Sequence, residues 1–256
     1  MLHAPLDLEL TLAHSQDDIR AAQRLRYRVF VEELGGAGPG VDAAAGLETD
    51  RFDAHADHLL LRDPARRGDD TDGVVGVYRL MTREQAVTAG GFYSASEFDL
   101  EPLMRNGGAL GELGRSCLHP AYRGSGALMK LWQGLARYVE ARGIETLFGV
   151  ASFHGTDLAR LQNALSHLHN LHLAPEPLRV RTLAPDCLPL LALEQIDSKA
   201  AMREVPPLIK SYLKLGGMIG QGVYPDHAFN TTDLCLILPV NRLQPNAVAR
   251  RLRAGA

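Results

Sequence analysis

Residues 111–143 have the sequence GELGRSCLHPAYRGSGALMKLWQGLARYVEARG, which changes physical character twice. Residues 110–118 alternate, so a strand here would place Glu112 on one face and Arg115 on the other. Pro120 ends this strand because proline cannot donate to a strand ladder. We therefore expect polar groups to approach a strand that carries charge on both faces.

A loop and a helix follow the strand. Glycines in the loop leave several backbone N–H groups unhindered at the helix entrance, and helix entrances attract anions. The helix has an apolar face and ends at Gly143, while Lys130 and Arg137 lie seven residues apart on another face. The pattern predicts an anion-binding loop with a basic flank, although an ordinary turn before a helix has the same pattern. The loop residues are Arg123, Gly124, Ser125 and Gly126.

Composition limits the classes of function. The chain has 256 residues and a formal net charge of −3, which gives no global attraction to nucleic acid. The cysteines are odd in number and lie in apolar segments, which indicates reduced thiols in a cytoplasmic protein. The first residues lack the basic character of a signal peptide, and no apolar run is long enough to span a bilayer. The three cysteines are Cys117, Cys187 and Cys235.

The remaining segments predict a mixed α+β architecture in one domain, residues 1–256, with a core at 6–240 and a basic tail at 241–256. Hairpins dominate the front of the chain, where residues 58–62 and 74–81 flank an Asp-Gly turn at residues 72–73 and predict a hairpin. Strands and helices alternate in the middle. Residues 35–57 predict a long loop, and residues 90–104 a loop with a short helix. We expect strands at 6–12, 58–62, 74–81, 145–152, 178–183 and 234–240, and helices at 17–33, 156–167 and 207–215.

Two arginines stand in unusual positions. Arg26 and Phe30 are four residues apart and share one face of the first helix, while Arg79 lies in an otherwise apolar strand. A buried arginine needs carboxylate partners. Asp50 and Asp53 in the preceding loop are the expected partners.

Glu112 and Arg115 are candidates for a shared site on the central strand. Glu112 could act as a base or bind an amine, and Arg115 could bind a carboxylate or support an acid. A purely structural ion pair explains the two residues equally well. Cys117 could be an activated thiolate because Arg115 is near in sequence, but a small apolar strand residue is the favoured interpretation.

Acidic and histidine side chains are dense between residues 48 and 58. A hard-metal site needs several carboxylates in a defined loop geometry, and no such geometry is evident, so we predict no metal. Pairing with arginines or solvation is favoured instead. Histidines near a predicted helix end, at 167, 169 and 172, are expected to be exposed or to cap the helix. The residues weighed for metal are Glu48, Asp50, Asp53, His55, Asp57 and His58.

The ordered set Arg26-x-x-x-Phe30, Asp50-x-x-Asp53, Arg79 and Glu112-x-x-Arg115 resembles the pattern of acyl-homoserine-lactone synthases and their relatives, which are GNAT-fold N-acyltransferases. Two longer stretches resemble the haemolysin-like N-acyltransferases that make lyso-ornithine lipid from ornithine and an acyl carrier protein thioester. These stretches are ELGRSCLHPAYR with GVASFHGTD, and PPLIKSYLKLGGMIGQGVYPDHAFNTTDLCLILP. The likeness covers about residues 20–240.

Two departures refine the resemblance. Lactone synthases usually carry a tryptophan shortly after the Phe30 position, but Gly35 and Gly36 occupy that region here. This argues against the homoserine-lactone branch. The GNAT phosphate signature is also met only in part, because Leu128 stands where a small residue belongs.

The resemblance implies a GNAT fold, with a mixed central sheet flanked by helices, and a soluble or peripherally membrane-bound enzyme without a tightly bound cofactor. The implied reaction moves a long 3-hydroxyacyl chain from acyl carrier protein to the α-amino group of ornithine. Glu112 would be the base, assisted by Arg115, and the loop would hold the phosphopantetheine phosphate. The implied acceptor site or its supporting ion pairs would comprise Arg26, Phe30, Asp50, Asp53 and Arg79.

Alternatives stay open at this stage. Another amine acceptor, such as glycine, tyrosine or S-adenosylmethionine, would need almost the same residues. Coenzyme A could replace the carrier protein as donor, although Lys130 and Arg137 would suit the acidic recognition helix of a carrier. A non-enzymatic binder of acyl carrier protein or lipid would not need Glu112.

Overall fold

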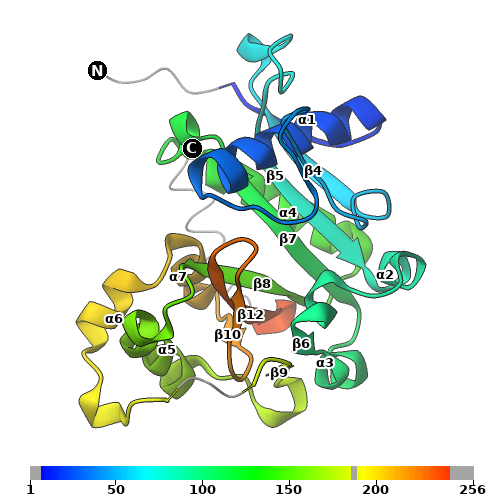
Figure 1. Cartoon of the computed structure of the whole chain (residues 1–256). Helices are drawn as coiled ribbons and strands as arrows, with labels where there is room; N and C mark the ends of the chain where they lie inside the picture. Colours follow the sequence, from blue (N-terminus) through cyan, green and yellow to red (C-terminus); the bar gives the residue numbers. More distant parts are fainter. Residues whose placement is uncertain (1–6, 186–188, 243–256) are drawn as a thin grey trace. The chain divides into compact units, whose positions relative to one another are not determined.

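The computed structural model describes residues 7–185 and 189–242 (Figure 1). These residues form two compact units, each assembled from separated segments. The first unit comprises residues 7–90 and 113–143, and the second comprises 91–112 and the described residues after 143. Strand β7 (Leu110–Leu118) contributes to both units. The expected single domain stays a prediction, because compact packing does not show that either unit folds alone.

The sheet strands of the first unit follow the order β1, β4, β5 and the second part of β7. Strands β1 (Glu9–Leu12), β4 (Asp57–Arg62) and β5 (Val74–Thr82) are antiparallel neighbours. The predicted hairpin of β4 and β5 is confirmed. Its connection is longer than a turn at residues 72–73, because residues 63–73 form a loop that includes the short helix η2 (Pro64–Arg66).

The helices of the first unit begin and end close to the predicted positions. Helix α1 (Gln16–Arg26) starts with a capping box at Ser15 and continues directly as the π-helix η1 (Tyr27–Glu33). Helix α4 (Ala127–Arg142) begins after Gly126 and ends at Gly143, whose left-handed conformation is typical of a helix end. The sequence analysis missed α2 (Arg83–Ala89), a short helix whose own capping box, at Thr82, marks its start.

A hydrophobic core lies between α1 and the sheet of the first unit. Small residues of α1 allow the helix to approach β4 and β5 closely, and Leu25 and Val29 fill the space between them. Cys117 of β7 belongs to this core, and Phe30 packs at its edge. The other buried members are Ala21, Ala22, Leu60, Val74 and Val77. This core fixes the end of α1, where Arg26 lies.

The sheet of the second unit contains both parallel and antiparallel neighbours. Strand β8 (Thr146–His154) pairs in parallel with the first part of β7 and antiparallel with β12 (Thr231–Pro239). The parallel ladder contains three residue pairs, and Glu112, opposite Phe148, is its last β7 residue. Short strands β10 (Met218–Ile219) and β11 (Tyr224–Asp226) also pair with β12. This mixed sheet confirms the predicted α+β class.

Helices of the second unit are α3 (Glu101–Asn106), α5 (Leu158–His172), α6 (Ser198–Glu204) and α7 (Pro207–Lys214). The expected strand at 178–183 is reduced to β9 (Arg181–Thr182), which pairs with β6 (Phe98–Asp99). In the first unit, β2 (Val41–Asp42) and β3 (Leu47–Glu48) interrupt the expected long loop. None of the helices in residues 7–185 and 189–242 is long and apolar enough to cross a bilayer.

The prediction that the histidines near residue 170 are exposed or capping is wrong for two of them. Helix α5 extends beyond the predicted end, so His167 and His169 lie within it and are buried. The His169 ring accepts the Gly222 N–H at its Nε2 atom over 2.8 Å. His169 therefore helps to hold the segment between β10 and β11 against α5.

Candidate active site

Three arginines and three carboxylates form a closed ion-pair network in the first unit. Arg26 binds Glu48 over 2.5 Å and Asp53 over 2.6 Å. Arg79 binds Asp50 over 2.5 Å and Asp53 over 2.9 Å. Each guanidinium thus connects two acids, as its several donors allow. The predicted pairing of Arg26 and Arg79 with Asp50 and Asp53 is present.

Arg115 completes the network from strand β7. Its Nε and Nη2 atoms bind Glu48 over 3.2 Å and Asp50 over 3.0 Å, respectively. The backbone of Arg115 is left-handed, with φ of 50°, which is uncommon for a residue with a side chain. This conformation departs from the regular alternation expected for residues 110–118. Because strained backbone persists only where its surroundings fix it, the network determines the local shape of β7.

Glu48 is the network residue whose role the sequence analysis missed. The sequence placed it among acids for which pairing with arginines or solvation was favoured over metal binding, without naming its partners. It is buried and binds both Arg26 and Arg115. The available signal was the spacing Glu48, Asp50, Asp53 together with three arginines, since a buried guanidinium usually needs more than one acceptor. The acids of this segment therefore serve as partners for arginines.

The network holds Asp50 and Asp53 in the ionised form. Burial alone would raise the pKa of Asp53, but the Arg26 and Arg79 guanidinium groups and a hydrogen bond from Gln23 hold it well below its usual range. Burial likewise opposes ionisation of Asp50, whose pKa is nevertheless lowered by Arg79 and Arg115. The carboxylates therefore stay charged near neutral pH.

Burial separates network residues that could bind the acceptor from residues that only form supporting ion pairs. The side chain of Arg26 is 0% exposed and that of Arg79 is 3% exposed, whereas Asp50 and Arg115 retain 16% and 13% exposure. Arg26 and Arg79 also each bind two carboxylates of the network. The geometry favours a supporting role for Arg26, Asp53 and Arg79, and leaves Asp50 and Arg115 at the accessible edge.

Glu112 is held differently, within the second unit. Its Oε2 and Oε1 atoms accept the backbone N–H groups of Tyr93 over 2.9 Å and Ser94 over 2.7 Å. These amides begin the short helix η3 (Tyr93–Ser96). The Glu112 side chain is buried, and both carboxylate oxygens have fixed positions.

Cys117 has no feature of an activated thiolate. It is buried in the core beside α1, and burial raises the pKa of its thiol to about 12. A thiol in this environment is protonated and weakly nucleophilic. The structure therefore agrees with the interpretation of Cys117 as a small core residue.

The predicted anion-binding loop is open, but its arginine is engaged. Gly124 and Gly126 have positive φ values of 79° and 86°, and a Cβ at either position would meet no atom within 4 Å. The Arg123 guanidinium forms a two-pronged ion pair with Glu33 at 2.5 Å and 2.7 Å. Phosphate binding by Arg123 would have to compete with this pair, whereas the backbone N–H groups at the start of α4 do not depend on it.

Lys130 and Arg137 are exposed on α4. Residues seven apart lie close to the same helix face, so both side chains extend from one side of α4. An exposed basic strip of this kind can attract an acidic partner. Carrier-protein docking by these residues stays a prediction.

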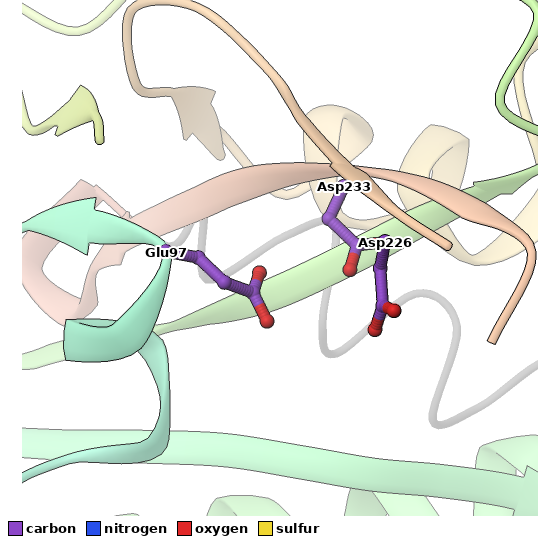
Figure 2. Close-up of side chains that lie close together, drawn as sticks. All are labelled: Glu97, Asp226 and Asp233. Carbon is purple, nitrogen blue, oxygen red and sulfur yellow. The ribbon is translucent and has the colours of Figure 1, made fainter. Parts of the chain in front are cut away.

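A group of three acids that the sequence analysis did not single out lies in the second unit. Glu97, Asp226 and Asp233 come from separate segments, and Figure 2 shows their carboxylates converging. One carboxylate oxygen from each lies within 4.8 Å of the others. Glu97 and Asp233 are buried, and Asp226 is half-buried. No sequence signal links Glu97 to Asp226 and Asp233, which lie on neighbouring strands much further along the chain.

Comparison with known proteins identifies the chain. Residues 25–133 match the model of the acetyltransferase (GNAT) domain. The chain is 52% identical to an L-ornithine N(alpha)-acyltransferase from Rhodobacter capsulatus, with 93% of this chain and 92% of that protein covered. It is 43% identical to the enzyme of the same name from Brucella abortus, over 94% of this chain and 88% of the other.

The chain belongs to the L-ornithine N(alpha)-acyltransferase family. Its GNAT fold agrees with the crystal structure of the acyl-homoserine-lactone synthase LasI, which shares 15% identity at a TM-score of 0.50 over 94% of each chain. At this identity the likeness concerns the fold alone. The family and fold implied by the sequence resemblance are confirmed, and this member of the L-ornithine N(alpha)-acyltransferase family is an acyltransferase.

Proposed function

We propose that this enzyme acylates the α-amino group of ornithine with a long 3-hydroxyacyl chain and gives lyso-ornithine lipid. The observation that carries the proposal is the 52% identity to an enzyme named L-ornithine N(alpha)-acyltransferase, which extends over 93% of the chain. The absence of a tryptophan at residues 35–36 supports an acceptor other than the one used by lactone synthases.

The proposed reaction is direct attack of the amine on the thioester. The nitrogen forms a bond to the acyl carbonyl carbon, the carbon–sulfur bond breaks, and the thiol leaves. The α-ammonium group must first lose a proton, so a carboxylate acting directly or through a water molecule is a suitable base. Glu112 fits this role because backbone N–H groups hold both of its carboxylate oxygens in fixed positions.

The ion-pair network of the first unit would have a supporting role rather than carry out chemistry. Its buried arginines and acids hold the end of α1, the segment at residues 48–53 and strand β7 in fixed positions. Asp50 and Arg115, at its accessible edge, are the members available for contact with the acceptor. A guanidinium such as that of Arg115 can bind the α-carboxylate of an amino acid.

For the donor, we propose an acyl chain on the phosphopantetheine arm of acyl carrier protein. Coenzyme A has a pyrophosphate that favours close backbone approach, and Leu128 occupies a position where a small residue would aid it. A carrier-bound arm has a single phosphodiester, for which the N–H groups after Gly126 suffice. Lys130 and Arg137 would meet the acidic surface of the carrier.

We propose that the enzyme acts in the cytoplasm and that its basic tail binds the inner membrane weakly. Its arginines, Arg250, Arg251 and Arg253, lie outside the described residues. Each basic residue near an anionic surface adds about 1 kcal/mol to binding. Co-sedimentation with anionic vesicles should therefore be reversed by salt and should weaken when the tail is removed. Binding that resists both changes would contradict this assignment.

A panel of acceptors and donors tests the proposed function. Purified enzyme is incubated with ornithine, glycine, tyrosine or S-adenosylmethionine, each with a 3-hydroxyacyl chain on acyl carrier protein or on coenzyme A. Mass spectrometry of the extracted lipids identifies the products. We expect ornithine with the carrier-bound donor to give the highest kcat/KM. Faster acylation of another amine would replace the acceptor, and no acylation of any amine would indicate a binding protein.

A further inference from the structure

The carboxylates of Glu97, Asp226 and Asp233 lie on the same face of the second-unit sheet as Glu112. Glu112 lies opposite Phe148 of β8, and Asp233 lies opposite Ser152. Because side chains of a strand alternate, residues 148 and 152 point to one face, and their partners share it. Asp226 shares this face too, because it is two residues from Tyr224, the residue opposite Asp233.

Residues 92–97 extend along this face and connect the two acidic positions. The Phe92 ring packs edge-on against Phe148, with ring centroids 4.9 Å apart. Positions 148 and 152 are separated by roughly 13 Å at ~3.3 Å per residue. Glu97, at the end of this segment, lies at the second position, because its carboxylate is close to those of Asp226 and Asp233. Cys235, opposite Val150 between the two positions, has a pKa raised by its burial and by the charges of both Glu112 and Glu97.

Ser94 gives an independent indication of a ligand. Its N–H donates to Glu112 over 2.7 Å, and its carbonyl accepts the Glu97 N–H over 3.1 Å. Its hydroxyl is completely buried and has no hydrogen-bond partner within the described part of the chain. Buried hydroxyl groups are normally hydrogen-bonded. A polar ligand between Glu112 and Glu97 would supply the missing partner.

The chemistry of the three acids favours a positively charged ligand. Neighbouring carboxylates disfavour one another's ionisation, and a cation placed between them removes that cost. A primary ammonium group has three N–H donors and no acceptor, which matches three carboxylate oxygens. Calcium prefers six to eight oxygen ligands, more than these three residues offer with one oxygen each.

We propose that Glu97, Asp226 and Asp233 bind the side-chain ammonium group of the acceptor amino acid. This inference rests on the proposed function, because ornithine carries a second amino group at the end of a short aliphatic chain. Holding that group as a cation at the three acids would leave the α-amino group to approach Glu112. The subsite would thereby select both the amino acid and the nitrogen that is acylated.

Norvaline provides the direct test, since it has the carbon chain of ornithine but lacks the side-chain amine. We expect the wild-type enzyme to prefer ornithine over norvaline by about a hundredfold in kcat/KM, the scale for loss of a buried charged contact. Asp226→Asn and Asp233→Asn should lower kcat/KM for ornithine by about tenfold or more while leaving norvaline unchanged. Glu101→Gln, in an exposed ion pair with Arg105, is the matched control and should behave as wild type.

The outcomes separate this subsite from the proposed function. If no amine is acylated, the proposed function fails. If ornithine is acylated but norvaline reacts equally well, or if the variants lose both substrates in parallel, the subsite assignment alone is wrong. Asp226 is half-buried, so Asp226→Asn is expected to fold even if Asp233→Asn does not. Loss of the ornithine preference after chelator treatment, restored by Mg²⁺, Ca²⁺ or Zn²⁺, would assign the acids to a metal and overturn the proposal.

Discussion

At the scale of single residues, Glu112 combines a fixed carboxylate with a position at the end of a parallel ladder. We expect Glu112→Gln to lower kcat at least about a hundredfold near neutral pH, because the amide cannot accept the proton of the amine. Steady-state kinetics with the carrier-bound donor measures this change. The glutamine amide would also face a backbone N–H donor, so circular dichroism and thermal unfolding must accompany the kinetics. Wild-type turnover in a folded variant would rule out Glu112 as the base.

Arg115 is expected to be sensitive to a conservative change. Lysine would keep the positive charge and the left-handed backbone, but it has no planar fork with which to bind Glu48 and Asp50 together. We expect Arg115→Lys to lower the free energy of unfolding by about 1–3 kcal/mol, as measured by urea denaturation. Arg105→Lys, in the exposed pair with Glu101, should cost less than about 1 kcal/mol. Equal effects of the two substitutions would show that the network contributes little to stability.

Substitution of the buried Cys117, unlike that of Glu112, is expected to have little effect on activity. Cys117→Ala should keep most of the activity, since the reaction needs no acyl-enzyme and the raised pKa keeps the thiol protonated. Activity assays and mass spectrometry of enzyme mixed with donor alone test this point. An inactive but folded variant, together with an acyl adduct on wild-type Cys117, would require a covalent mechanism.

At the scale of elements, substitutions in helix α4 test whether the acyl donor is bound to a carrier protein. Reversing Lys130 and Arg137 to glutamate should lower kcat/KM with the carrier-bound donor by about tenfold at low salt, because exposed charges mainly affect association. The rate with the matching coenzyme A thioester should change little, and the difference should shrink as salt rises. Unchanged kinetics with the carrier-bound donor would remove these residues from the docking surface.

Helices and strands with clear local sequence signals, such as a glycine at a helix end, were predicted at the right positions. Gly126 and Gly143 marked helix ends correctly, and the residue patterns of β7, β8 and α4 predicted their positions. Helix α6 was missed because it is short and lies in a proline-rich region, where local preferences are weak. The capping box of α2 went unused because its seven residues follow a strand without an intervening loop.

Contacts in the candidate site could be predicted only where a residue type requires a particular kind of partner. Buried arginines need acids, so the partners of Arg26 and Arg79 could be anticipated. The amide contacts of Glu112 could not, because any residue has a backbone N–H and its direction depends on the fold. The convergence of Glu97 with Asp226 and Asp233 likewise depends on strand pairing between distant segments, which no local pattern encodes.

At the scale of the whole molecule, the perturbed groups predict how stability depends on pH. The pKa values of Asp50 and Asp53 are below their ordinary 3.8 in the folded state, so the unfolded chain binds more protons in acid. Their contribution is therefore present above that value and is lost progressively as the pH falls below it. Burial lowers the pKa of His58 from 6.5, so stability should also fall as the pH drops below that value.

Urea denaturation at a series of pH values tests both the aspartate prediction and the His58 prediction. Asp50→Asn should reduce the acid-dependent loss of stability, and His58→Gln should flatten the profile between pH 6.5 and the acid region. Glu101→Gln, which changes an exposed acid, should leave the shape of the profile unaltered. A wild-type profile that stays flat as the pH falls below 3.8 would contradict the assignment of the buried network as the acid-sensitive element.

The assembly of each unit from separated segments has a consequence for synthesis on the ribosome. Residues 7–90 emerge first, but the first unit also requires residues 113–143, which follow the first segment of the second unit. Until α4 and the end of β7 have left the exit tunnel, the apolar surfaces of β4 and β5 lack part of their cover. Nascent chains in this interval are exposed to aggregation and suited to chaperone binding. Slowing translation before α4 has left the exit tunnel should therefore reduce the soluble yield more than slowing it afterwards.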